Sequence, residues 1–189
     1  MSQGMPPTPA GRRLLAAAAE LFYAQGINAV GVATIAEAAN VTKKTLYDCF
    51  GSKDGIVVAY LTQRHQDWRR ALETRLSADE PSPLMVFDSY LDILRREPGV
   101  NGCGFINAAA DLPAGHRAMK VIRDHKAEVR RQIDALLPSR YGTASASARE
   151  TIVTHLFYLL EGGTAEAGLL GSLKPLEDSR RITQSLLTL

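Results

Sequence analysis

One stretch, VATIAEAANVTKKTLYDCFGSK at residues 32–53, constrains the fold more than any other part of the chain. Apolar residues in its first half, among them Ile35 and Ala36, predict a short helix with one apolar face. Asn40 can end that helix, because asparagine tolerates a left-handed backbone better than most residues. Thr42 is suited to cap a second helix, because its side-chain oxygen can accept a hydrogen bond from a free backbone N–H. The stretch therefore predicts two short helices joined by a tight turn.

The second of these helices begins with cations and hydroxyls. Lys43, Lys44 and Thr45 follow the cap, and Tyr47 lies further along the same helix. The N-terminal end of such a helix is the end that a helix-turn-helix protein points into the major groove of DNA. Lysine pairs are also common on the solvated faces of helices that bind nothing. The residues by themselves therefore leave both a DNA-reading helix and a plain solvated surface open.

The same residues resemble the DNA-binding signature of the TetR family of bacterial transcriptional regulators. The family pattern is an Ile-Ala-x-x-Ala helix, a turn, a helix led by Ser or Thr, then Leu-Tyr-x-x-Phe and a Ser-Lys-acid step. The resemblance covers residues 9–60 and includes the helix that precedes the signature. It is carried here by Ile35, Ala36, Ala39, Thr42, Leu46, Tyr47, Phe50, Ser52, Lys53 and Asp54.

Three positions depart from the family pattern. Gly31 lies where Ser or Thr often caps the first helix, so we expect a weakly capped start. Asn40 replaces the usual turn glycine, which its backbone freedom allows. Lys44 lies where a small residue is common, so the contacts to bases are expected to differ from those usual in the family.

The resemblance implies an all-α protein. An N-terminal three-helix DNA-binding unit with the helix-turn-helix would be followed by a C-terminal helical bundle for ligand binding and dimerisation. We expect a disordered arm at residues 1–7, the DNA-binding domain at residues 8–53, and the regulatory and dimerisation domain at residues 54–189. Apolar residues recur at helical spacing after the signature, and no strand pattern is visible. Further helices are expected over residues 115–137, 148–170 and 176–189.

The expected helix at residues 115–137 has two distinct faces. Its inward stripe includes His125 and Val129 and ends at Leu136. The opposite face carries many cations, and interleaved acidic residues indicate a solvated face rather than a second nucleic-acid patch. The cations assigned to that face are Arg123, Lys126, Arg130 and Arg131.

Composition excludes several classes of protein. A net charge of +2 excludes a nucleic-acid coat protein, although a local basic patch is enough for a specific DNA binder. The N-terminus lacks the apolar core of a signal peptide, and no apolar run is long enough to span a membrane. We therefore expect a cytoplasmic protein with no membrane partner. Cys49 and Cys103 have no metal-ligand spacing, and a secreted disulfide framework is not expected.

Known catalytic motifs are absent from the sequence. It has no H-E-x-x-H helix, no glycine-rich phosphate loop after a strand, and no nucleophile elbow. We therefore expect a protein that is not an enzyme and has no catalytic residues, no metal and no cofactor. Asp111 and His125 could form an acid–base pair, although helical bundles also bury such pairs for structural reasons.

The resemblance assigns DNA contacts to residues in and around the second short helix. Side chains at the start of that helix are expected to face base edges, and flanking side chains are expected to hold phosphates. Base edges are assigned to Lys43, Lys44 and Thr45, phosphates to Thr34, Tyr47 and Lys53, and the helix cap to Thr42.

A second, shorter resemblance concerns residues 101–111, NGCGFINAAAD. It resembles the Gly-Cys-x-Phe-x-Asn-Ala segment of a TetR/AcrR-like subgroup, which lies where the regulatory pocket forms. We expect a mostly apolar pocket with a few polar groups, and therefore a small, partly hydrophobic effector. The candidate ligand-binding residues are His65, Trp68, Phe105, Asn107, His125 and Phe157.

These features predict a ligand-responsive transcriptional regulator that acts as a repressor. It would bind a palindromic double-stranded operator as a homodimer through its last two helices, and the effector would release it. Two alternatives remain open. One is a redox-responsive regulator that uses Cys103, for which a small core cysteine is the simpler interpretation. The other is a helical small-molecule carrier that does not bind DNA.

Overall fold

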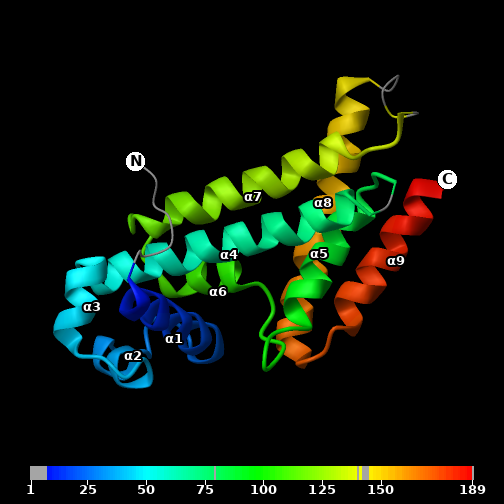
Figure 1. Ribbon diagram of the computed structural model, residues 1–189. Coiled ribbons are helices and arrows are strands. Elements are labelled where there is room, and N and C mark those ends of the chain that lie inside the picture. The colour runs from blue at the N-terminus through cyan, green and yellow to red at the C-terminus, as the bar shows by residue number, and fades with distance from the viewer. Residues whose placement is uncertain (1–7, 79, 140, 142–144, 189) are drawn as a thin grey trace. The chain divides into compact units, whose positions relative to one another are not determined.

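A computed structural model describes residues 8–78, 80–139, 141 and 145–188 of the chain. The expected disordered arm at residues 1–7 lies outside this range. The described residues form helices without strands, which confirms the predicted all-α class (Figure 1). The helices are α1 (Pro9–Gln25), α2 (Val32–Ala38), α3 (Lys43–Phe50), α4 (Lys53–Leu76), α5 (Leu84–Leu94), α6 (Gly104–Asp111), α7 (Ala118–Ala135), α8 (Ala146–Leu170) and α9 (Lys174–Thr188). Among them, no helix combines the length and the apolar character that a membrane crossing needs.

The predicted helix ends are confirmed where local chemistry determines them. Thr42 Oγ1 accepts a hydrogen bond from the Thr45 N–H at 3.1 Å and caps α3. Asn40 has a φ of 49° and makes the left-handed turn between α2 and α3. Gly31 offers no side-chain cap to α2, as expected. These bonds connect residues only a few positions apart, which is why the sequence predicts them.

The chain forms two compact units. The first unit comprises the described residues of Met1–Gln66 together with Gly104–Arg123. It therefore contains α1, α2, α3, α6 and the N-terminal parts of α4 and α7. The second unit comprises the described residues of Asp67–Cys103 and Asp124–Leu189, which include α5, α8 and α9.

In the first unit, α1, α2 and α3 pack against one another around fully buried apolar side chains (Figure 1). Leu14 of α1, Ile35 of α2 and Leu46 of α3 have no exposed surface. Arg13 of α1 also donates a hydrogen bond to the Ala39 carbonyl at 3.2 Å, next to the end of α2. The two short helices therefore owe their position to α1 and to a shared apolar core.

Helix α6 is an addition that the sequence did not predict, and it is fastened to the end of α1. The Asp111 carboxylate accepts a hydrogen bond from the Ile27 N–H at 2.6 Å. The Asn28 side chain donates to the Asp111 carbonyl at 2.7 Å. At Gly26, where φ is +84°, an added Cβ would lie only 2.9 Å from the same carboxylate, so this close approach requires glycine.

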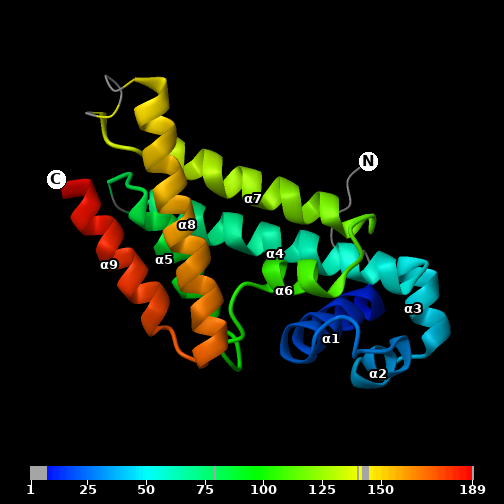
Figure 2. The same ribbon diagram turned by 180° about the vertical axis from the view of Figure 1, so that it is seen from behind.

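In the second unit, α8 and α9 lie side by side, and α5 packs against α9 (Figure 2). The Arg180 guanidinium of α9 binds the Asp88 carboxylate of α5 through hydrogen bonds of 2.5 and 2.9 Å. Gly102 has a φ of +68°, and an added Cβ there would lie 2.7 Å from the Thr164 carbonyl of α8. Close backbone packing therefore holds the segment before α6 against α8.

The predicted solvated face of α7 is wrong at Lys126. Its side chain retains only 17% of its surface and forms an ion pair of 2.7 Å with Glu161 of α8. Lys126 lies at helical spacing from the buried residues Ile122 and Val129, so its position belongs to the packed stripe. The stripe also ends at Leu137, which is buried, rather than at Leu136. Glu161 satisfies the buried ammonium group, and no single-helix pattern could reveal that partner.

Candidate nucleic-acid interface

Helix α3 presents one apolar and one polar face. Leu46 is completely buried, and Lys43, Lys44, Tyr47 and Asp48 are exposed. Tyr47 keeps 48% of its surface accessible, which is unusual for a large aromatic side chain in this protein. The exposed face therefore combines two cations, one aromatic ring with a hydroxyl group and one carboxylate.

The threonines at the start of α3 form a local pair. Thr45 is half-buried, and its hydroxyl lies 2.9 Å from the hydroxyl of Thr42. The Thr45 hydroxyl is thus already engaged by the capping residue. The predicted contact between Thr45 and a base edge stays a prediction, and it would require the pair to rearrange or to share its hydroxyl protons.

The residues assigned to phosphates lie on three different helices. Thr34 is exposed in the first turn of α2, and Lys53 is half-buried in the first turn of α4. Ser52 caps α4 by accepting a hydrogen bond from the Gly55 N–H at 3.0 Å. Helix N-termini attract anions, so Thr34 and Lys53 lie where a phosphate is favoured. Their phosphate contacts stay a prediction.

Asp48 is the exposed residue of α3 that the sequence-based assignment left out. It follows Tyr47 directly and lies four positions after Lys44, so it shares the face that carries the assigned residues. Its helical spacing from Lys44 is enough to place Asp48 on this face from the sequence alone. A carboxylate differs from the predicted contacts, which are cations and hydroxyls.

The candidate effector residues are divided between the two units. His65, Phe105 and Asn107 belong to the first unit, where Phe105 is buried and Asn107 is exposed. The hollow beside Asn107 holds about 10 Å³, far less than a small-molecule site needs. Trp68, His125 and Phe157 belong to the second unit.

Within the second unit, Trp68 and His125 are in contact. Their ring centroids lie 5.0 Å apart in an edge-to-face arrangement. The His125 Nε2 lies 2.8 Å from the Tyr90 hydroxyl. Phe157 is half-buried and packs beneath the Arg130 guanidinium at 5.4 Å. Trp68 and His125 thus form a packed aromatic contact, whereas Phe157 stacks with a cation.

The predicted Asp111–His125 acid–base pair is not supported. The Asp111 carboxylate accepts the Ile27 N–H, and His125 is bonded to Tyr90. Asp111 is also only half-buried. Both groups are accounted for by structural hydrogen bonds.

A buried polar cluster in the second unit consists of Tyr90, Cys103, Lys126 and Glu161. The Lys126 ammonium donates to Glu161 at 2.7 Å and to the Cys103 sulfur at 3.3 Å. Burial raises the pKa of the Tyr90 hydroxyl well above its ordinary value, so the hydroxyl is neutral at physiological pH. Sequence reasoning missed this cluster, although Glu161 interrupts an otherwise apolar run of α8.

Burial has a competing effect on the cluster's ammonium group. By itself it would lower the pKa of the Lys126 side chain, because the charged form loses hydration. The ion pair with the Glu161 carboxylate at 2.7 Å favours the charged form, and the pKa lies above its ordinary value of 10.5. Lys126 is therefore a charged ammonium group that is paired with Glu161 within the packed unit.

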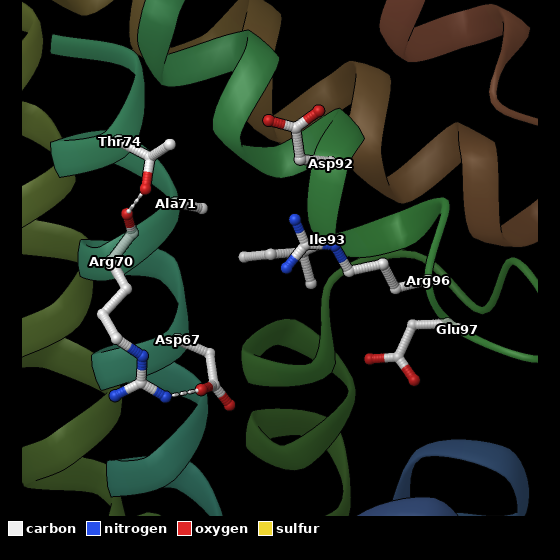
Figure 3. A pocket seen from close by; sticks show the side chains of 8 residues that line it. All are labelled: Asp67, Arg70, Ala71, Thr74, Asp92, Ile93, Arg96 and Glu97. Atoms are coloured by element: carbon white, nitrogen blue, oxygen red, sulfur yellow. Dashed lines mark hydrogen bonds and ion pairs between the residues drawn. The ribbon is translucent and has the colours of Figure 1, made fainter. Parts of the chain in front are cut away.

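A hollow of about 340 Å³ lies between α4 and α5 of the second unit (Figure 3). Arg70 pairs with Asp67, and the Thr74 hydroxyl donates to the Arg70 carbonyl at 2.8 Å. The Arg75 guanidinium binds Asp92 and lowers the pKa of that carboxyl group. Most of the lining is charged, and it includes none of the predicted effector residues. The lining residues are Asp67, Arg70, Ala71, Thr74, Asp92, Ile93, Arg96 and Glu97.

Comparisons with known proteins identify the family. The sequence profile described as bacterial regulatory proteins, tetR family, matches residues 14–60. The solved structure of SCO4454, a TetR-family transcriptional regulator from Streptomyces coelicolor, is 30% identical. The similarity covers 96% of this chain and 90% of that one, with a TM-score of 0.83. The chain therefore belongs to the TetR family of transcriptional regulators.

Two more distant structures share the fold. A TetR transcriptional regulator from Legionella pneumophila is 21% identical over 96% of this chain and 99% of its own, with a TM-score of 0.78. A TetR transcriptional regulator from Chloroflexus aurantiacus is also 21% identical, over 93% and 92% of the two chains, with a TM-score of 0.78. Comparison with curated protein sequences gave no match.

Proposed function

We propose that this TetR-family regulator binds a palindromic operator through α3 and acts as a repressor. The observation that carries the proposal is the exposed face of α3, where Lys43, Lys44 and Tyr47 project from a helix capped by Thr42. Lysine side chains at the start of such a helix can reach acceptors on base edges. Thr34, Tyr47 and Lys53 supply phosphate contacts that orient the protein. Because the operator of a bacterial regulator lies in the cytoplasm, the proposal includes a cytoplasmic location.

The proposal includes a homodimer formed by α8 and α9. Leu169 of α8 is 84% exposed and Tyr158 is 63% exposed, and α9 exposes Ile182 and Leu186. Large apolar side chains gathered on two adjacent helices are typical of a protein–protein interface. A twofold interface of this kind matches the symmetry of a palindromic operator.

The proposed effector is a small, partly hydrophobic molecule. Trp68 and His125 form a buried aromatic contact with a polar group in the second unit, and His65, Phe105, Asn107 and Phe157 remain candidate effector residues. An effector releases the operator only if it binds better to the state in which the two recognition helices are misplaced. Its differential affinity for the two states then sets the loss of DNA affinity.

The test is retardation of DNA that flanks the protein's own gene. Wild-type protein is expected to form a complex that weakens steeply as salt rises, because binding releases counterions from the phosphates. The double variant Lys43→Ala, Tyr47→Ala is expected to lose at least about ten-fold in affinity. Lys174→Ala, which removes an exposed lysine from α9, serves as the matched control.

Two results would contradict the proposal. A folded double variant that binds as tightly as the wild type would refute the site assignment. Absence of any salt-sensitive DNA complex would favour a small-molecule carrier without DNA binding. In that case, apolar small molecules that raise the melting temperature of the wild type would support the carrier function.

One observation favours a second mode of regulation, through oxidation of Cys103. The Lys126 ammonium lies 3.3 Å from its sulfur, so a charged group contacts the atom that would be oxidised. Hydrogen peroxide would oxidise this sulfur to a sulfenic acid: the S–O bond forms as the O–O bond breaks, and the departing hydroxide takes the thiol proton to become water. Peroxide should then lower operator affinity in the wild type and not in Cys103→Ser. Equal responses of the two proteins would reject this mode.

A further inference from the structure

The exposed face of α3 carries two opposite charges whose use is not explained by phosphate binding. Lys44 and Asp48 lie four positions apart, so they are neighbours on one side of the helix. Both side chains are exposed. Side chains at this spacing have Cβ atoms about 5–6 Å apart and can reach adjacent groups on one surface.

A structural role does not account for Asp48. Within the part of the chain that the structure describes, its carboxylate forms no hydrogen bond or ion pair, and it does not pair with Lys44. Asp48 lies in the C-terminal half of α3, where a negative charge opposes the helix dipole. Aspartate is also a weaker helix former than most residues. Most other polar residues at this position would stabilise the helix more than aspartate does.

A carboxylate on a DNA-facing surface also opposes binding, because it approaches a polyanion. It can be accommodated only where the DNA offers a hydrogen-bond donor. In the major groove, cytosine presents the N4 amino group as a donor, and aspartate and glutamate accept from it. The guanine of the same base pair presents O6 and N7 as acceptors, which suit a lysine. One G·C pair therefore displays the two groups that Lys44 and Asp48 require.

We propose that Lys44 and Asp48 together read a G·C pair in each operator half-site, with Lys44 on guanine and Asp48 on the cytosine amino group. The inference rests on the proposed DNA-binding function of α3 and adds the base that it selects. Asp48 also improves discrimination in a second way. Its charge weakens contact with every sequence that lacks the donor, so it lowers non-specific affinity while the cognate pair compensates for it.

The test is selection of binding sites from randomised double-stranded DNA by the full-length protein, followed by sequencing. The wild type is expected to enrich a palindrome with one fixed G·C pair in each half-site. Asp48→Ala should keep the rest of the half-site and lose about ten-fold of discrimination at that pair. Asp48→Asn should shift the preference toward adenine, because an amide can bind the N6 and N7 groups of that base.

A charge control separates base reading from general electrostatics. Glu20→Gln removes one negative charge from an exposed position on α1 of the same unit. It should leave the selected sequence unchanged. All three variants alter exposed side chains, and their helical circular dichroism should match that of the wild type.

The outcomes are distinguishable. If Asp48→Ala enriches the same half-site as the wild type and only binds all DNA more tightly, Asp48 is a plain surface charge and the inference is overturned. A G·C pair whose discrimination is lost in a fourth variant, Lys44→Ala, and retained in Asp48→Ala also overturns it. If the wild type enriches no sequence at all, the proposed DNA-binding function fails and this inference fails with it.

Discussion

At the scale of single residues, Lys126 shows how tertiary context changes the meaning of a charge. Arg123 and Asp124, three and two positions before it, are exposed, and the local pattern predicts a solvated face. The structure instead pairs it with Glu161 beneath the surface of the second unit. A buried ion pair is weak evidence of net stability, but removing one partner leaves an uncompensated charge.

Lys126→Met is therefore expected to destabilise the protein by about 3 kcal/mol, because the Glu161 carboxylate loses its partner. The double variant Lys126→Met, Glu161→Gln should be substantially more stable than the single variant. Urea unfolding followed by circular dichroism measures both. If the single and double variants unfold at the same urea concentration, Glu161 is not held by this pair.

The same residue predicts the direction of a pH effect. The folded state raises the pKa of Lys126 above its ordinary value of 10.5, so the folded state binds the proton more tightly. The contribution of protonated Lys126 to folding stability is complete below pH 10.5, the ordinary pKa of lysine, and is lost as pH rises through the higher pKa of the folded state. Between pH 6 and pH 9 the stability difference between wild type and the double variant should accordingly stay constant.

At the scale of helices, α6 is the element whose attachment the structure reveals. It begins directly after Cys103, where the chain leaves the second unit, and it ends at Asp111, which binds the chain after α1. The first unit therefore includes a helix contributed from much later in the sequence. Its contact with Ile27 and Asn28 stabilises the end of α1, the helix that supports α2 and α3.

Asp111→Ala is expected to loosen this attachment. It leaves the Ile27 N–H without its acceptor and should cost about 1–2 kcal/mol. Hydrogen–deuterium exchange should rise at residues 26–28 and 104–111, while exchange in α8 and α9 stays unchanged. Asp178→Ala, at a half-buried position on α9, is the control. Unchanged exchange around Ile27 in the Asp111 variant would show that the bond is not important for holding α6.

At the scale of the whole molecule, the exposed apolar side chains of α8 and α9 predict that the chain does not function alone. Replacing Leu169 and Leu186 together with serine should weaken self-association at least about ten-fold, because the proposed interface would lose two large apolar side chains. Analytical ultracentrifugation measures the dimer–monomer equilibrium, with Arg69→Ser on α4 as the control. A variant that remains dimeric at the same concentrations would place the interface elsewhere.

The dimer prediction also has a consequence for DNA. A monomer presents one recognition helix and can contact only one half-site, so operator affinity should fall together with self-association. Loss of the dimer without loss of operator affinity would contradict the proposed twofold complex. The base preference proposed for Lys44 and Asp48 would still be tested separately by selection from randomised DNA.

The sequence by itself determined the helical class, the turn at Asn40, the cap at Thr42, and the family. These features depend on interactions among residues a few positions apart, or on a motif with fixed spacing. Only the tertiary structure decided the burial of Lys126 and the partner of Asp111, because each depends on which helix faces meet after the chain folds. The effector residues show the same limit: His65 and Trp68 are one turn apart on α4, yet they belong to different compact units.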